Sequence, residues 1–242
     1  MKIRSLACAA ISVGSLTAAG AAGIDTTDPG LAAAFQSGLT VQTFESLAGR
    51  TPQAITAYTQ GVAVSPTSFV FNQVPGVQFS VGGAVGTNMP ALFQLGGTIA
   101  GNAHSGSTVL GPVDFDFTTK FGPGAFIEVF FPVKVSAVGF WLDPALGNVS
   151  LIAADTNFAF SGLEEHTLET FAGTAGHFVG ISRPTADIGG FKIIGTGDTG
   201  FSIDDFSYGV AGTITPVPEP AEWALLLCGA AAIAARRRRR VQ

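Results

Sequence analysis

Cysteine is missing from residues 24–218, because the chain's two cysteines are Cys8 and Cys228. This absence excludes a disulfide framework for that stretch, whose roughly 195 residues are enough for one domain with a substantial core. Basic residues are also scarce there: five Lys or Arg stand against fifteen Asp or Glu, a formal charge of −10. Such an excess of negative charge argues against nucleic acid as a partner.

Histidine and the larger aromatic residues are rare as well. The three histidines, His104, His166 and His177, do not show the spacing of a metal site. Residues 24–218 contain one Trp, Trp141, and two Tyr beside many Phe. Phe at alternating positions is more typical of a core than of a platform that stacks on sugar rings. Composition alone therefore identifies neither a metal centre nor a carbohydrate site.

Short runs of β-branched and aromatic residues, many alternating with polar ones, recur along residues 39–209. A period of two is typical of strands. Residues 29–36 differ, because Asp28 is placed as an N-cap, Pro29 as the first helical residue and Gly38 beyond the end. The pattern predicts an all-β sandwich of two sheets with one short N-terminal helix. The predicted strand segments are LTVQTFES, VQFSV, VDFDFTT, AFIEVFF, VSAVGFWL, VSLIAAD, HFVGIS, FKIIG and FSIDDFSYG.

Clustered carboxylates are the first candidates for catalysis. Asp114 and Asp116 lie two residues apart in VDFDF, so they share one face of the predicted strand, as a pair for glycoside hydrolysis could. Alternation with Val and Phe is equally that of any half-buried strand. The EEHTLE segment, residues 164–169, could hold a metal or act in acid/base chemistry, but a solvated polar loop explains it better. We therefore predict no enzymatic activity.

Glycine-rich segments match further sequence signatures but lack the neighbouring residues or elements that those signatures need. GTGDTG, residues 195–200, matches the dinucleotide motif, but a strand follows it where that motif needs a helix. Its DTG occurs once, whereas an aspartic protease needs two adjacent carboxylates. HSGS, residues 104–107, lacks the glycine spacing around a hydrolase nucleophile. We interpret residues 195–200 as the turn of a hairpin between FKII and FSIDDFSY.

The amino terminus has the features of an export signal. Lys2 and Arg4 precede an apolar run over residues 6–19, and Ala19 and Ala21 have the spacing that signal peptidase accepts. We therefore predict a signal peptide over residues 1–23. It places the following domain outside the cytoplasm.

The carboxyl terminus has three consecutive parts. Prolines at 216, 218 and 220 predict an extended linker. Residues 223–235 carry no charge and no proline, and five arginines follow at 236–240. This order predicts a membrane helix over residues 221–235 that is short for a bilayer, with its arginines on the cytoplasmic side.

This tail resembles the PEP-CTERM sorting signal of Gram-negative bacteria over residues 216–240. The sorting motif consists of Val217, Pro218, Glu219 and Pro220, and the stop-transfer cluster consists of Arg236, Arg237, Arg238, Arg239 and Arg240. The resemblance implies that an exosortase acts near Pro218–Pro220. It also implies that the helix is a transient inner-membrane anchor, after which the domain reaches the cell surface or the extracellular matrix.

Two segments of the domain, TFES and FSIDDFSYG, resemble the first and last strands of jelly-roll, galactose-binding-like sandwiches, a group that includes many carbohydrate-binding modules. The resemblance implies a structural calcium ion bound by Glu45 with Asp204 or Asp205, and Asp204 is the first choice. Simple alternation would place Asp205 on the face of Ile203 and Asp204 on the face of Phe206. A buried carboxylate needs a partner, which calcium would supply; the alternative is that these acids are surface charges.

These observations divide the chain into a signal peptide (1–23), a jelly-roll β-sandwich ectodomain (24–214) and a sorting signal (215–242). The predicted function is that of a non-catalytic exported protein of the cell surface or matrix. Its expected partners are an exosortase, the membrane and exopolysaccharide. A carbohydrate-binding module in the strict sense is the alternative, and a polysaccharide hydrolase is a more distant one.

Overall fold

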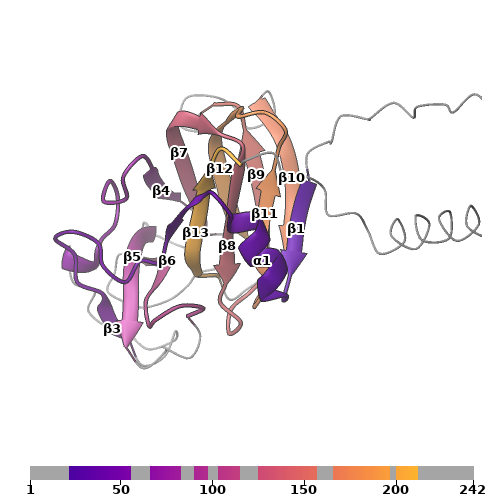
Figure 1. Cartoon of the computed structure of the whole chain (residues 1–242). Coiled ribbons are helices and arrows are strands. Elements are labelled where there is room, and N and C mark those ends of the chain that lie inside the picture. Colours follow the sequence, from indigo (N-terminus) through magenta and orange to yellow (C-terminus); the bar gives the residue numbers. More distant parts are fainter. Residues whose placement is uncertain are drawn as a thin grey trace, which may run out of the picture. The chain divides into compact units, whose positions relative to one another are not determined.

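The fold is seen in a computed structural model that describes residues 22–55, 66–82, 90–97, 103–114, 125–156, 166–196 and 200–211. The chain divides into two compact units, Met1–Ala211 and Gly212–Gln242, and every described residue belongs to the first. The described residues form two β-sheets, one α-helix and a short 3-10 helix, η1 (Pro66–Ser68) (Figure 1). The predicted all-β class with a two-sheet arrangement is confirmed.

Sheet A contains eight strands within the described residues. Its order is β1 (Ala22–Thr26), β11 (Phe178–Ser182), β8 (Ala137–Leu142), β13 (Ile203–Gly209), β6 (Val109–Asp114), β5 (Pro90–Gly97) and β3 (Gln53–Ile55), and β2 (Thr40–Gln42) also pairs with β13. The pairings are antiparallel except that of β3 with β5. Because β2 pairs with β13, the segment leading to Glu45 lies beside the strand that carries Asp204, as predicted.

Sheet B contains five antiparallel strands. Their order is β10 (Thr167–Gly173), β9 (Val149–Ala154), β12 (Ile188–Gly195), β7 (Phe126–Val135) and β4 (Gln78–Gly82). Alternate side chains of these strands are buried against sheet A. Phe191 of sheet B meets Phe140 of sheet A edge to face, with ring centroids 6.3 Å apart, so the core lies between the two sheets as in other sandwiches.

The helix α1 (Pro29–Gln36) covers part of the outer face of sheet A, over β8 and β11 (Figure 1). It has the predicted bounds and cap: the Asp28 carboxylate accepts a hydrogen bond from the Gly30 amide at 2.7 Å. Its Phe35 ring rests against Phe178, with centroids 5.3 Å apart. The helix therefore closes a second, smaller apolar cluster on the side of sheet A away from the main core.

Several details differ from the sequence predictions. β3 and β5 lie where no strand was predicted, and β6 begins four residues before the predicted VDFDFTT segment. β10 runs through the TLE part of EEHTLE, where a polar loop was expected. β12 and β13 belong to different sheets, so they do not form the hairpin that was predicted around residues 195–200. β1 begins at Ala22, two residues before the predicted start of the domain, and it pairs with β11.

Candidate functional site

A bulge in β13 presents two acids to the outer side of sheet A. The register of β13 against β8 shifts between Asp204 and Ser207, and Asp205 has a left-handed backbone with φ +48°. Asp204 is paired with Trp141, while Phe206 returns to the main core. The alternation expected from sequence is therefore wrong here, because the extra residue of the bulge moves Asp205 away from the face of Ile203.

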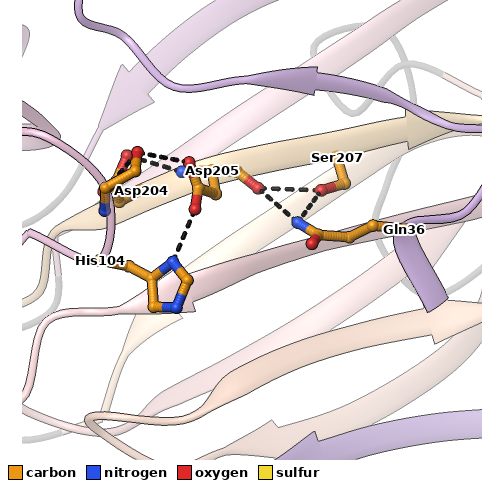
Figure 2. Close-up of polar contacts among 6 residues, drawn as sticks. Gln36, His104, Asp204, Asp205 and Ser207 are labelled. Carbon is orange, nitrogen blue, oxygen red and sulfur yellow. Dashed lines mark hydrogen bonds and ion pairs between the residues drawn. The ribbon is translucent and has the colours of Figure 1, made fainter. Parts of the chain in front are cut away.

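The loop at residues 103–108 is bound to these acids (Figure 2). The Ser105 amide donates to Oδ2 of Asp204 at 2.7 Å, and the Ser105 hydroxyl donates to Oδ1 of Asp205 at 2.6 Å. The other oxygen of Asp205 lies 2.7 Å from Nδ1 of His104. Both acids thus fix the loop through charge-assisted hydrogen bonds.

Glu45 binds the same loop at its end, at Ser107 and Thr108. Its Oε1 accepts hydrogen bonds from the amides of Ser107 and Thr108, both at 2.8 Å, and Oε2 accepts one from the Thr108 hydroxyl at 3.1 Å. Gly106 has φ +56°, and a Cβ there would lie 2.4 Å from the Glu45 carboxylate carbon. Any larger residue at 106 would displace Glu45, so this glycine makes room for the acid.

Asp204 is buried, with 2% of the residue exposed. Its pKa is raised to about 7, mainly by burial and in part by the charges of Asp205 and Glu45, while the amides of Ser105 and Asp205 oppose the rise. The three acids that the sequence singled out therefore bind one loop, and ionising Asp204 carries an electrostatic cost.

Two aromatic groups complete the site, and the sequence analysis did not connect them with it. The imidazole of His104 stacks on the indole of Trp141, with centroids 3.9 Å apart and planes 5° apart. Beside them, the side-chain amide of Gln36 donates to the hydroxyl of Ser207 at 2.7 Å and so ties α1 to β13 (Figure 2). The only sequence signal for His104 was its place in HSGS, and nothing there indicated a neighbour in β8.

The arrangement does not form a Ser-His-Asp triad. Serine, histidine and aspartate meet, but the Ser105 hydroxyl donates to the carboxylates of Asp204 and Asp205 and not to the imidazole of His104. Asp114 ends β6, while Asp116 lies outside the described residues. In EEHTLE, His166 contacts Asp155 at 3.0 Å and Glu169 lies 4.0 Å from Arg183; residues 164 and 165 also lie outside the described part.

The calcium hypothesis is consistent with the donor chemistry of the cluster. Carboxylate oxygens are the ligands that calcium prefers. Near Glu45, the fully buried Gln94 donates its amide to the carbonyl of Phe44, and its Oε1 has no hydrogen-bond partner within the described residues. Across the described ranges, however, no three acidic, histidine or cysteine side chains are gathered as a metal-binding group. In this structure the carboxylates of Glu45 and Asp204 accept hydrogen bonds from the loop's own backbone amides.

The predicted sorting motif and membrane helix and the arginine cluster, all within residues 215–242, lie outside the described residues, as does the predicted signal peptide up to residue 21. Within the part of the chain that is described, no helix is long and apolar enough to cross a membrane.

Comparison with known proteins gives distant structural likenesses. No family model and no curated protein matches the sequence. Similar solved structures include the K2 cleaved adhesin domain of Lys-gingipain, at 12% identity and TM-score 0.38, covering 71% of this chain and 99% of that one. The module TmCBM61, solved with β-1,4-galactotriose, has 17% identity and TM-score 0.34 over 55% of this chain and 88% of its own.

A further likeness is to the enzymatically active domain of tailspike protein 4 from bacteriophage CBA120. It has 14% identity and TM-score 0.34, and covers 62% of this chain but 22% of that one. These neighbours comprise an adhesin domain, a carbohydrate-binding module and an enzyme domain. At such low similarity, no function is carried over from them to this chain.

Proposed function

We propose that the chain is an exported, non-catalytic protein of the cell surface or extracellular matrix, with a jelly-roll β-sandwich sorted by its tail and associated with exopolysaccharide. The observation that carries the proposal is the tail itself: a VPEP motif, an uncharged segment and five arginines in that order at residues 217–240. The contacts of Ser105 support the non-catalytic part, because its hydroxyl is bonded to Asp204 and Asp205 and not to the imidazole of His104, so these side chains do not form a Ser-His-Asp triad. An exosortase and the membrane are then the partners of residues 215–242.

The arginine cluster provides the test of this proposal. Replacing all five residues 236–240 with Gln removes the charge that resists translocation, about 2.5–3.5 kcal/mol for an arginine at a helix centre. We expect the variant to be released or misdirected, measured by membrane fractionation and by the mass of the processed chain. Replacement with five Lys keeps the charge and should leave both unchanged. Unaltered fractionation and processing in the Gln variant would contradict the sorting function.

Carbohydrate binding in the strict sense is the second candidate function. The observation that favours it is an aromatic ring, His104, that is half-exposed beside a hydroxyl and carboxylates. Aromatic faces bordered by polar groups are the usual elements of sites for ligands that are apolar on one side and polar at the rim.

We also propose that the β-sandwich domain binds calcium as a structural ion. Glu45 and Asp204 would hold it through carboxylate oxygens, with Asp205 as the alternative to Asp204. In this structure both oxygens of each acid take part in hydrogen bonds, so the ion would replace some of these contacts. The positive charge would offset the cost of ionising the buried Asp204.

Thermal unfolding of the full chain in calcium and in chelator tests the ion. Binding to the native state alone stabilises by about 2.7 kcal/mol at a hundredfold excess over Kd, so we expect a higher Tm in calcium. Asp204→Asn should abolish the difference, whereas Asp28→Asn, an acid at the cap of α1, should keep it. Equal Tm values for the unmodified chain in the two buffers would refute calcium binding.

A further inference from the structure

His104 has one free aromatic face. Its imidazole lies flat on Trp141, and its Nδ1 edge is bound to Asp205. The side chain is nevertheless 41% exposed. Since the indole covers one face and Asp205 one edge, the exposed part consists of the opposite face and the Nε2 edge. The stack therefore exposes a flat imidazole ring to solvent on the outer side of sheet A.

The orientation of this ring is fixed before any ligand arrives. Nδ1 lies 2.7 Å from one oxygen of Asp205, and the Ser105 hydroxyl donates to the other oxygen at 2.6 Å. In the tautomer that donates its one ring proton from Nδ1 to Asp205, Nε2 is a hydrogen-bond acceptor. A ring held in one rotamer by its neighbours loses little entropy when a ligand stacks on it.

Trp141 is the rigid support of the ring. It is 7% exposed and packs edge to face with Phe178 at 5.7 Å. Its indole N–H is buried and has no hydrogen-bond partner among the described residues. A buried donor without a partner costs stability, and the packing of the indole in the apolar cluster beneath α1 offsets that cost and holds the ring in place.

We propose that the exposed face of His104, supported by Trp141, is the stacking platform for one pyranose ring of a neutral polysaccharide. This inference rests on the second candidate function, carbohydrate binding, and assigns it a site. The C–H face of a pyranose matches a flat aromatic ring, and a sugar hydroxyl donates to Nε2 at the rim. Uronic acid polymers are disfavoured, because the Asp205 carboxylate borders the ring and Glu45 binds the same loop, which adds negative charge near the platform.

Tryptophan fluorescence of the full chain provides the measurement. Trp223→Phe leaves Trp141 as the only tryptophan, so its emission reports on the stack. In this background the chain is titrated with a neutral β-glucan, a neutral β-galactan and polygalacturonate. We expect a neutral polymer to change the emission in a saturable way, and polygalacturonate to have no effect.

Substitutions at His104 separate the platform from its surroundings. His104→Ala removes the ring, and we expect affinity to fall at least about tenfold. His104→Phe keeps a ring without Nε2, and affinity should fall by no more than about threefold. His166→Ala is the matched control, because His166 is also a half-exposed histidine bound to an aspartate, Asp155; its binding should equal that of the unmodified site. Denaturant unfolding of each variant confirms that it is folded.

The outcomes distinguish this site from the function on which it rests. Undiminished binding of a neutral polymer by His104→Ala would overturn the site and leave carbohydrate binding standing. Failure of the unmodified stack to bind any of the three polymers would overturn both. Tighter binding of polygalacturonate than of the neutral polymers would overturn the assigned ligand class.

Discussion

Replacing Asp143 with Asn is expected to stabilise the domain by about 3 kcal/mol near pH 8. Asp143 follows β8 and is 3% exposed. Burial raises the pKa of its carboxyl to about 6, against the opposing hydrogen bonds from the Ala145 amide and the Ser202 hydroxyl. Asparagine keeps the shape without a charge to bury: its Oδ1 can accept from the Ala145 amide, and its Nδ2 can donate to the Ser202 oxygen in place of the bond that the hydroxyl donates to Asp143.

The sign of the pH dependence follows from this raised pKa. In the unfolded chain the carboxyl loses its proton near pH 4, and in the folded chain near pH 6. Between these values the folded state binds more protons, so its stability falls as the pH rises. The advantage of Asp143→Asn should therefore be absent below about pH 4 and complete above about pH 7, as measured by urea unfolding across that range.

Asp187 provides a control of opposite sign. Its carboxylate is bonded to Arg183 at 2.6 and 2.9 Å, and this contact is the main reason that its pKa is lowered. Asp187→Asn should destabilise the domain at neutral pH and lose that effect in acid. An Asp143→Asn variant whose stability relative to the unmodified chain does not change with pH would contradict the assignment.

Phe35→Ala is expected to cost about 3–5 kcal/mol of unfolding free energy, the usual loss for a buried phenylalanine. Phe35 is 7% exposed and fills the cluster between α1 and sheet A. The strands beneath it carry Gly139 and Gly180, where an added Cβ would lie 2.9 and 3.0 Å from the Phe35 ring. No side chain on those glycines can fill the cavity that alanine leaves.

Leu31 is the matched control for this substitution. It lies on the same helix but is 51% exposed, so Leu31→Ala should change stability by less than about 0.5 kcal/mol. Both values are measured by urea unfolding of the full chain. Similar losses of unfolding free energy for the two variants would show that α1 is stabilised by its helical propensity and not by the packing of Phe35 against sheet A.

The sequence predicted the elements that local chemistry specifies. The Asp28 cap and Gly38 define α1, whose observed bounds match the prediction, and the alternation in AFIEVFF predicted the strand that contains Phe126–Phe131. β10 was missed because Glu169 and Thr170 lie on an edge strand of sheet B, where polar residues meet no penalty. Local polarity cannot distinguish such a strand from a loop.

The candidate site was predicted in part, because only some of its features can be recognised from local sequence. Glu45, Asp204 and Asp205 were brought together by the resemblance of TFES and FSIDDFSYG to the first and last strands of galactose-binding-like sandwiches, and in the structure Glu45 lies just after β2. The bulge at Asp205 could not be predicted from the sequence, because a positive φ at a non-glycine residue depends on the tertiary contacts that hold it. The partners His104 and Trp141 come from separate segments, and only the fold makes them neighbours.

The position of β1 bears on the order in which this domain can fold. Its residues are among the first of the domain to be synthesised, yet Ile24 pairs with Gly180 of β11. β2 likewise waits for β13, the last strand of the sheet. Such distant pairings make folding slow, since a long loop must close before either contact forms. Sheet A therefore cannot acquire its two N-terminal strands until nearly the whole domain has been made, and until then their backbone amides and carbonyls lack their partners in the sheet.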